Sequence, residues 1–299
     1  MNKPKNWILI LLLFILAVLG TSCQSDEQET IQIASKPMSE QYILAEMLAL
    51  LIESDTDLAV ETTLGVGGGT SNIHPAMESG DFDLYPEYTG TGWLFVLKND
   101  LIEDGDEMYR QLKTAYEEEY ALTWSGLYGF NNTFALAVSN ELYEEYGIES
   151  YSDLASVSGL LDFGAEYDFY EREDGYPGLV ETYGFDFANT VELDIGLKYE
   201  AIAGGEVDVI NVFSTDGRLK EYDLKVLEDD LGFFPSYHAA TVIRQDTLTN
   251  HPALEETIEK LTGQISNDEI TQMNYLVEVE NQDPKQVAED FLREKGLLD

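Results

Sequence analysis

The feature that most constrains the fold is an alternation of short apolar runs with longer periodic segments near the start of the folded chain. Ile31–Ala34, Leu58–Leu64 and Asp81–Tyr85 have the composition of strands. A helix with Ser39 as its predicted N-cap and a second helix over Asn72–Ser79 separate them. The apolar face of the first helix repeats every 3.6 residues, through Ile43, Leu44, Met47, Leu48, Leu51 and Ile52. This β-α-β-α-β order predicts an α/β fold with a mostly parallel sheet.

The stretch Asp81–Trp93, DFDLYPEYTGTGW, places turn chemistry directly after a predicted strand. In open α/β sheets, ligands bind beyond the carboxyl ends of the strands, so this stretch is a candidate ligand site. The alternative is a strand-to-helix loop whose tyrosines only pack. The earlier glycine-rich run Gly65–Thr70 lacks the Gly-Lys-Ser/Thr of a phosphate loop and predicts a tight turn or a close approach of the backbone to a ligand.

The N-terminus predicts export from the cytoplasm. Lys3 and Lys5 precede the apolar run Trp7–Leu19, which is too short to span a bilayer comfortably, and small residues lead to Cys23. Residues 1–22 are therefore read as a signal peptide. The pattern resembles the lipobox of bacterial lipoproteins, with Gly20 where that pattern usually has Leu, and the resemblance implies lipidation of Cys23. Residues 23–30 would tether the fold to the extracytoplasmic face of the plasma membrane.

The charge balance excludes one class of partner. The chain has 58 acidic and 16 basic residues and a net charge of −42. Nucleic-acid binding needs a basic surface, so we expect no nucleic-acid partner. Such a charge suits a saline or alkaline setting, because salt screens the self-repulsion. The length after Cys23 is near the limit for one core and predicts two domains.

An enzyme is not expected. The three histidines, His74, His238 and His251, show no metal-ligand spacing, and no G-x-S-x-G elbow occurs. Carboxylates are so numerous that no pair stands out as acid and base. The single cysteine excludes an internal disulfide and a C-x-x-C metal or redox site. We therefore predict no catalytic residues, no metal and no cofactor.

Aromatic residues are abundant, with 18 tyrosines and 13 phenylalanines. Several lie at strand ends or in loops: Tyr88, Tyr128, Phe169, Tyr176, Phe213 and Tyr237. A cage of aromatic faces binds a quaternary ammonium, with about 0.5–2 kcal/mol from each ring. The alternative for each ring alone is ordinary core packing. Neither a ring nor such a ligand titrates near neutrality, so a cage predicts a flat affinity from about pH 6 to 9.

Six motifs in order along the chain carry a resemblance to a known family. They are Ser35–Leu44, Tyr85–Thr91, Tyr128–Thr133, Glu171–Tyr176, Ser214–Arg218 and Phe233–Tyr237. Together they resemble the substrate-binding proteins of osmoprotectant ABC importers, the ProX/OpuC-type receptors for glycine betaine, carnitine, choline and related compounds. The resemblance implies two α/β lobes of the type II periplasmic-binding-protein class, closing on a ligand in the cleft between them.

The resemblance also implies a set of site residues. The ammonium cage would be formed by Tyr88, Tyr128, Phe169, Phe213 and Tyr237. The ligand carboxylate would be held by Lys36, Thr91 and Arg172, and an arginine fork matches a carboxylate bidentately. Phe213 stands where many relatives have Tyr. Without the motifs, Lys36 and Arg172 would be read as exposed salt bridges.

The resulting prediction is a monomeric, lipid-anchored receptor that delivers a betaine to the permease of an ABC importer. Lobe 1 is expected to comprise residues 30–128 and 238–299, and lobe 2 residues 129–237. Lys36 and Arg172 favour a ligand with a carboxylate: glycine betaine, proline betaine or carnitine. The alternatives are a choline-specific receptor, a receptor for another small cationic solute, and an enzyme or sensor on the same fold.

Overall fold

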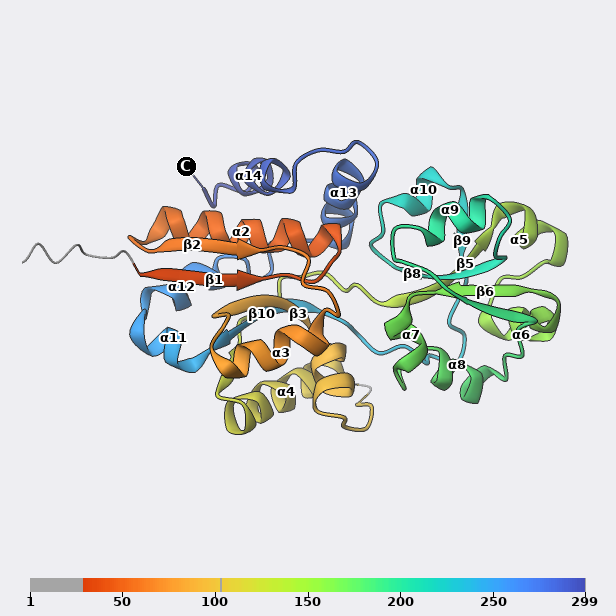
Figure 1. Ribbon diagram of the computed structural model, residues 1–299, viewed down its shortest axis with the longest axis horizontal. Helices are drawn as coiled ribbons and strands as arrows, with labels where there is room; N and C mark the ends of the chain where they lie inside the picture. The colour runs from red at the N-terminus through yellow and green to blue at the C-terminus, as the bar shows by residue number, and fades with distance from the viewer. Residues whose placement is uncertain (1–28, 103, 299) are drawn as a thin grey trace, which may run out of the picture.

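The computed structural model describes residues 29–102 and 104–298. The predicted signal peptide, Cys23 and most of the predicted tether lie outside these ranges. The described residues form two α/β units that lie side by side along the long axis of the molecule (Figure 1). We call the unit built on the first sheet lobe 1 and the unit built on the second sheet lobe 2. No helix in the described ranges is both long and apolar enough to cross a membrane.

Lobe 1 contains a sheet with the strand order β2-β1-β3-β10-β4 within the described ranges. Its strands are β1 (Thr30–Ala34), β2 (Ala59–Thr63), β3 (Leu84–Tyr88), β4 (Leu122–Trp124) and β10 (Ala239–Arg244). β1 runs parallel to β2 and β3, whereas β10 runs antiparallel to both β3 and β4. The sheet is therefore mixed rather than mostly parallel, because a strand from the end of the chain returns between β3 and β4.

Helices cover both faces of this sheet (Figure 1). One face carries α2 (Ser39–Asp55), α12 (Ala253–Glu259), α13 (Asn267–Glu278) and α14 (Pro284–Glu294), and the other carries α3 (Thr70–Ser79) and α4 (Gly105–Glu119). α11 (Gln245–Asn250) follows β10. The six apolar positions predicted for the first helix are all buried in α2, as its period requires.

Lobe 2 contains a second mixed sheet, with the order β7-β6-β8-β5-β9 within the described ranges. Its strands are β5 (Phe134–Ser139), β6 (Asp162–Ala165), β7 (Asn189–Glu192), β8 (Val209–Phe213) and β9 (Leu224–Val226). Its helices are α5 (Asn140–Tyr146), α6 (Tyr151–Val157), α7 (Tyr167–Glu171), α8 (Tyr176–Tyr183), α9 (Lys198–Ala203) and α10 (Arg218–Glu221). Separate apolar clusters fill the two faces, one with residues of α6 and α8 and the other with residues of α9.

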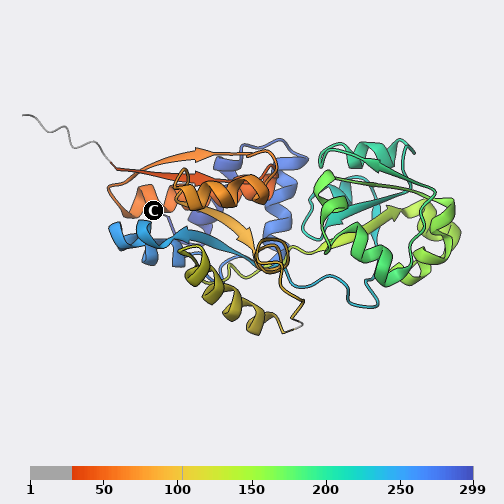
Figure 2. The same ribbon diagram turned by 60° about the horizontal axis from the view of Figure 1, so that its bottom comes forward.

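The chain crosses between the lobes twice, after β4 and before β10 (Figure 1 and Figure 2). The two crossing segments pair with each other at an antiparallel bridge between Asn131 and His238. The amide of Asn132 donates to the carbonyl of Tyr237 at 3.1 Å, and that of Tyr128 donates to Ala239 at 2.9 Å. Paired crossing strands at this point support the division at residues 129 and 237, which stays a prediction.

Several predicted boundaries differ from the structure. Ser39 is the first residue of α2 rather than its N-cap, which is Met38. The strand expected over Asp81–Tyr85 is β3, Leu84–Tyr88, and all five of its residues are buried. Pro86 and Glu87 disfavour a central strand, but the neighbours β1 and β10 impose one. The glycine, proline and aromatic residues of segment 168–187 are typical of a loop, but this segment contains part of α7 and all of α8.

Candidate functional site

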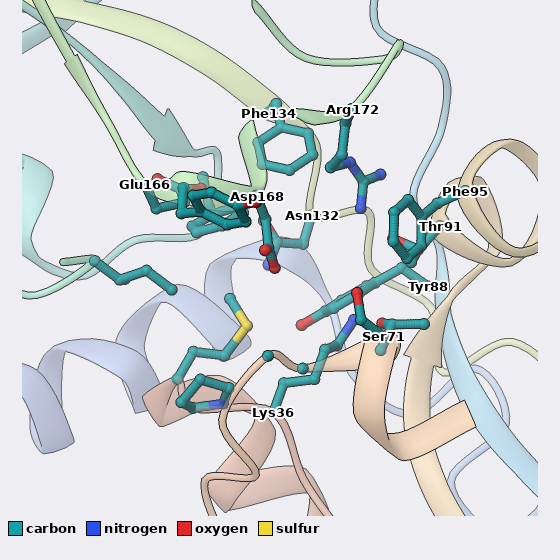
Figure 3. Close-up of a pocket in the computed structure, with 18 of the residues that line it drawn as sticks. Lys36, Ser71, Tyr88, Thr91, Phe95, Asn132, Phe134, Glu166, Asp168 and Arg172 are labelled. Carbon is teal, nitrogen blue, oxygen red and sulfur yellow. The ribbon is translucent and has the colours of Figure 1, made fainter. Parts of the chain in front are cut away.

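A cavity of about 320 Å³ lies between the lobes, in the size range of small-molecule sites (Figure 3). The carboxyl ends of β1, β3, β6 and β8 all lead to it, as expected for a ligand site of an α/β protein. Its lobe 1 wall includes Lys36, Thr70, Ser71, Tyr88, Thr91 and Phe95. Its lobe 2 wall includes Phe134, Glu166, Asp168, Arg172 and Phe213, and the crossing segments add Asn132 and Tyr237.

The lobe 1 wall is built by the stretch that follows β3. Tyr88 is the last residue of β3, and Thr91–Val96 (η1) forms a short π-helical turn that places Thr91 and Phe95 on the cavity. Gly90 joins the two and permits a close approach, since a Cβ there would lie 2.5 Å from ring carbons of Tyr237. The stretch predicted to contact a ligand is thus the end of β3 followed by a tight turn, and Gly90 allows this turn to pack against the ring of Tyr237.

Lys36 is fixed on this wall by an acid of the same lobe. Its Nζ pairs with Glu87, whose other carboxylate oxygen accepts a 2.6 Å hydrogen bond from Thr70. Burial lowers the pKa of Lys36, and Glu87 opposes this shift. The same Nζ lies 4.4 Å from the ring centroid of Tyr88. One face of Tyr88 is therefore occupied by a cation of the protein.

Arg172 is fixed in the same manner in lobe 2. Its Nε donates to Asp174 at 2.8 Å and its Nη2 pairs with the other oxygen of that carboxylate, which also accepts from the Tyr237 hydroxyl at 2.6 Å. Burial alone would lower the pKa of Arg172, but Asp174 raises it above its ordinary value. The guanidinium lies between Phe95 of lobe 1 and Phe134 of lobe 2, 5.1 and 5.3 Å from their centroids. Arg172 therefore joins the two walls.

The lobe 2 wall also carries acids that were not predicted as site residues. Glu166 follows β6 and accepts from Asn211 at 2.9 Å, with Nζ of the fully buried Lys198 at 3.4 Å. Asp168 has an exposed side chain that lines the cavity, and partial desolvation by the cavity wall raises its pKa. Their position after a strand was the available signal.

Phe213 lines the cavity as expected, and it lies beside Phe134, which was not among the predicted cage residues. Its centroid lies 5.1 Å from that of Phe134, which begins β5. Lys198 Nζ lies 4.8 Å from the Phe213 centroid. These two rings form the apolar part of the lobe 2 wall, next to the acids.

Two of the predicted cage residues, Tyr128 and Phe169, are buried behind the cavity wall. The hydroxyl of Tyr128 is hydrogen-bonded to Thr241 Oγ1 at 2.6 Å within the lobe 1 core. Phe169 packs behind Phe134, with centroids 5.2 Å apart. The structure brings Tyr88, Phe213 and Tyr237 to the cavity, together with Lys36, Thr91 and Arg172. Within the described ranges, no group of three or more His, Cys, Asp or Glu residues could hold a metal ion.

Comparison with known proteins places this site in a family. Residues 29–294 match the family model described as the substrate binding domain of ABC-type glycine betaine transport systems. The chain is 34% identical, over 100% of its length and 99% of the relative's, to the carnitine transport binding protein OpuCC of Listeria monocytogenes. It is 48% identical over 271 residues to the ergothioneine transport permease/ergothioneine binding protein EgtU of Helicobacter pylori, which covers 91% of this chain but only 48% of that longer protein.

A solved structure supports the same conclusion. The crystal structure of a glycine betaine/carnitine/choline ABC transporter protein matches with a TM-score of 0.73 and 36% identity, covering 90% of this chain and 100% of the other. The predicted two-lobed α/β fold is confirmed, as is the prediction of a transport substrate-binding protein rather than an enzyme. The chain belongs to the family of substrate-binding domains of ABC-type glycine betaine transport systems.

Proposed function

We propose that the protein captures a zwitterionic quaternary-ammonium solute in the cavity between its lobes. The ligand carboxylate is held by Lys36, Thr91 and Arg172, and its ammonium faces Phe213, Phe134 and the acids of lobe 2. The observation that carries this proposal is the uneven distribution of charge in this cavity. Lys36 and Thr91 of lobe 1 and Arg172 of lobe 2 supply its hydrogen-bond donors, whereas Glu166, Asp168 and Phe213 lie on the lobe 2 wall. The ring of Phe134 lies between the two groups, 5.3 Å from Arg172 and 5.1 Å from Phe213.

The proposed orientation follows from the chemistry of the two ends. A quaternary ammonium has no N–H donor, so it gains from aromatic faces and from the field of carboxylates rather than from hydrogen bonds. A carboxylate gains from a lysine, a threonine hydroxyl and an arginine fork. Glycine betaine, proline betaine and carnitine carry both groups. Choline has no carboxylate and leaves the donor end without a partner.

Ergothioneine is a second candidate ligand, favoured by one feature of the lobe 2 wall. It is a betaine whose imidazole-thione ring adds N–H donors. The carboxylate of Glu166, held by Asn211 and Lys198, is a fixed acceptor at the cavity. Glycine betaine and proline betaine have no donor for it, whereas the ring of ergothioneine does. The relative from Helicobacter pylori, named for ergothioneine, adds support.

Isothermal titration with glycine betaine, proline betaine, carnitine, choline, ergothioneine and arginine tests the proposal. We expect binding of at least one betaine and weaker binding of choline. The absence of heat with every quaternary-ammonium ligand, or tighter binding of arginine, would overturn the assignment.

The variant Glu166→Gln separates the two candidates. It keeps the size of the side chain but weakens the acceptor and removes its charge. We expect a loss of about tenfold or more for ergothioneine, since a hydrogen bond to a charged group contributes about 1.5–3 kcal/mol. Glycine betaine, which has no hydrogen-bond donor, should lose less. Equal losses for both would remove the argument for ergothioneine.

We further propose that Cys23 is lipidated and that residues 23–30 hold the receptor at the extracytoplasmic face of the plasma membrane, where a monomer delivers its ligand to ABC permease subunits. The lipobox-like N-terminus and the family of the chain support this. Cys23→Ser should release the protein from the membrane fraction of the producing cell. Retention of the variant in that fraction would contradict the anchor.

A further inference from the structure

Glu40, in the first turn of α2, is a buried carboxylate without a basic partner. Its exposed fraction is 2%, and no salt bridge to it exists among the described residues. Instead it accepts hydrogen bonds from four neutral donors. They are the hydroxyl of Tyr88, Nδ2 of Asn132 at 2.8 Å, Oγ1 of Thr215 at 2.7 Å and Nδ2 of Asn274 at 3.0 Å. Four donors fill the acceptor sites of a carboxylate.

These donors come from four separate parts of the molecule. Tyr88 lines the ligand cavity and Asn274 lies on α13 of lobe 1. Asn132 lies on the first crossing segment, and Thr215 lies in the turn after β8 of lobe 2. Any movement that separates this turn from α2 removes the Thr215 hydrogen bond and leaves the buried carboxylate less satisfied, which is costly.

The turn that carries Thr215 is fitted closely to lobe 1. The amide of Gly217 donates to Glu278 of α13 at 3.0 Å. A Cβ on Gly217 would lie 2.5 Å from the backbone nitrogen of Tyr275. Nδ2 of Asn274 also donates to the carbonyl of Thr215, at 2.9 Å. The turn after β8 therefore packs closely against α13, with the backbone of Gly217 against that of Tyr275.

We propose that Glu40 is a positioning residue that orients the ring of Tyr88 toward the ligand and makes this orientation depend on closure of the lobes. It acts through Tyr88, which also carries the Lys36 ammonium on one ring face. In the arrangement described here, Thr215 and Asn132 complete the set of donors around Glu40, and the Tyr88 hydroxyl donates to a fully hydrogen-bonded acceptor. Opening of the lobes would remove the Thr215 donor. The effect on ligand affinity rests on the proposed function, whereas the effect on closure does not.

The variant Glu40→Gln tests the proposal, with Glu46→Gln as the matched control. The glutamine amide replaces an acceptor oxygen with a donor that opposes the existing donors. Glu46 is a buried glutamate of the same helix whose contacts, Thr62 and Lys285, are away from the cavity. Its variant reports the general cost of neutralising a buried acid of α2.

Closure is measured without any ligand as the distance between spin labels on the two lobes, in a Cys23→Ser chain. The exposed residues Glu118 of α4 and Glu145 of α5 are the labelling positions, each changed to Cys. We expect Glu40→Gln to shift the distance distribution to longer values and Glu46→Gln to leave it unchanged. A wild-type distribution in Glu40→Gln would overturn the proposal, even if no ligand of the panel binds and the proposed function fails.

Affinity is measured with whichever betaine binds the wild type. Glu40→Gln should weaken binding about tenfold or more, and Glu46→Gln should not. Adding Tyr88→Phe to Glu40→Gln should cause little further loss, because both remove the same hydrogen bond. Unchanged affinity in Glu40→Gln, or fully additive losses, would refute the positioning role. If Glu40→Gln fails to fold, Thr215→Val is used instead, because it removes only the donor from lobe 2. It should lengthen the spin-label distance and weaken ligand binding, and wild-type values of both would overturn the proposal.

Discussion

The two walls of the cavity differ in the groups that they present to a ligand. The lobe 1 wall presents donors, Lys36 and Thr91, with the lysine neutralised by Glu87 of the same lobe. The lobe 2 wall presents acceptors and phenylalanine rings, with Glu166 neutralised in turn by Lys198. Arg172 is the exception, since it extends from lobe 2 to the donor end. The difference gives a zwitterion one favourable orientation, which exists only when both walls are present.

The walls also differ in what their rings already contact. Tyr88 of lobe 1 has Lys36 over one face, and Phe213 of lobe 2 has Lys198 at 4.8 Å. Phe134 has Arg172 at 5.3 Å. Each ring therefore offers a ligand ammonium its remaining face, next to a cation of the protein. The acids of lobe 2 offset that repulsion, so we infer that lobe 2 receives the ammonium.

The largest expected effect comes from Arg172→Met, which removes the residue that joins the walls. Truncating one partner of a buried charge pair costs about 2–5 kcal/mol, so betaine affinity should fall at least about 30-fold by calorimetry. The double variant with Asp174→Asn controls for the acid left unpaired and should remain weak. Choline, which has no carboxylate, should lose less. An equal loss for choline and betaine would contradict the assigned donor end.

Gly90→Ala tests the fit of the lobe 1 wall against Tyr237. The new methyl would overlap the ring, and overpacking costs about 1–3 kcal/mol, so we expect a loss of affinity of about 5-fold to 150-fold. Gly67→Ala is the control, because a Cβ there has no atom within 4 Å. Unchanged affinity in Gly90→Ala would show that the position of Tyr237 does not matter for binding.

Phe213→Leu tests the lobe 2 end. Removing one π face should cost about 0.5–2 kcal/mol, seen as a loss of a few-fold to about 30-fold in betaine affinity. Tyr128→Phe is the comparison, because that residue lies behind the wall. It should lower stability by about 1 kcal/mol through the lost Thr241 hydrogen bond and leave affinity unchanged. A loss of betaine affinity in Tyr128→Phe but not in Phe213→Leu would show that Tyr128, rather than Phe213, contacts the ammonium.

The smallest expected effect on ligand affinity concerns pH and the acids between the lobes. Burial and then Asp216 raise the pKa of Glu278 from its ordinary 4.5 to about 8, and Arg218 opposes the shift. Between these two pH values the folded chain keeps a proton that the unfolded chain has lost, so this group's stabilisation declines as pH rises through about 8. The slope is at most about 1.4 kcal/mol per pH unit.

Urea unfolding from pH 5 to 9 measures this decline, and Glu278→Gln should flatten it. Because Glu278 accepts from Gly217 across the lobes, the flat affinity expected from an aromatic cage should hold more closely in this variant than in the wild type. Parallel pH profiles of stability for the wild type and Glu278→Gln would contradict the assignment of this decline to Glu278.

Local pattern was sufficient for the elements in which periodicity and burial agree. The apolar face of α2 is an example, and so is the capping box at Ser266 and Glu269 that opens α13. It failed at β3, where Pro86 and Glu87 indicate a turn but the neighbouring strands impose an extended chain. It also failed over 168–187, where glycine, proline and aromatic residues conceal two short helices.

The residues of the site also fall into those that local sequence predicts and those that only tertiary packing places. Lys36, Thr91, Phe213 and Tyr237 lie at the cavity because they are at or just after strand ends or on a crossing segment. Arg172 lies there because it is the C-cap of α7, the short helix that follows β6. Glu166 was hidden among 58 acids, and only the fold shows that its partner is a buried lysine. Whether a ring lies in the wall or behind it, as for Tyr128, depends on packing between distant segments, which a sequence does not display.

The paired crossing segments have a mechanical consequence. Hydrogen bonds between the segments at Asn131, Asn132 and Tyr237 resist sliding of one segment along the other, whereas a two-stranded ribbon twists readily. We therefore expect the lobes to rotate about this joint more readily than they slide past each other. If they do, a partner that touched both lobes at once would detect ligand occupancy from the angle between the lobes, without contacting the ligand.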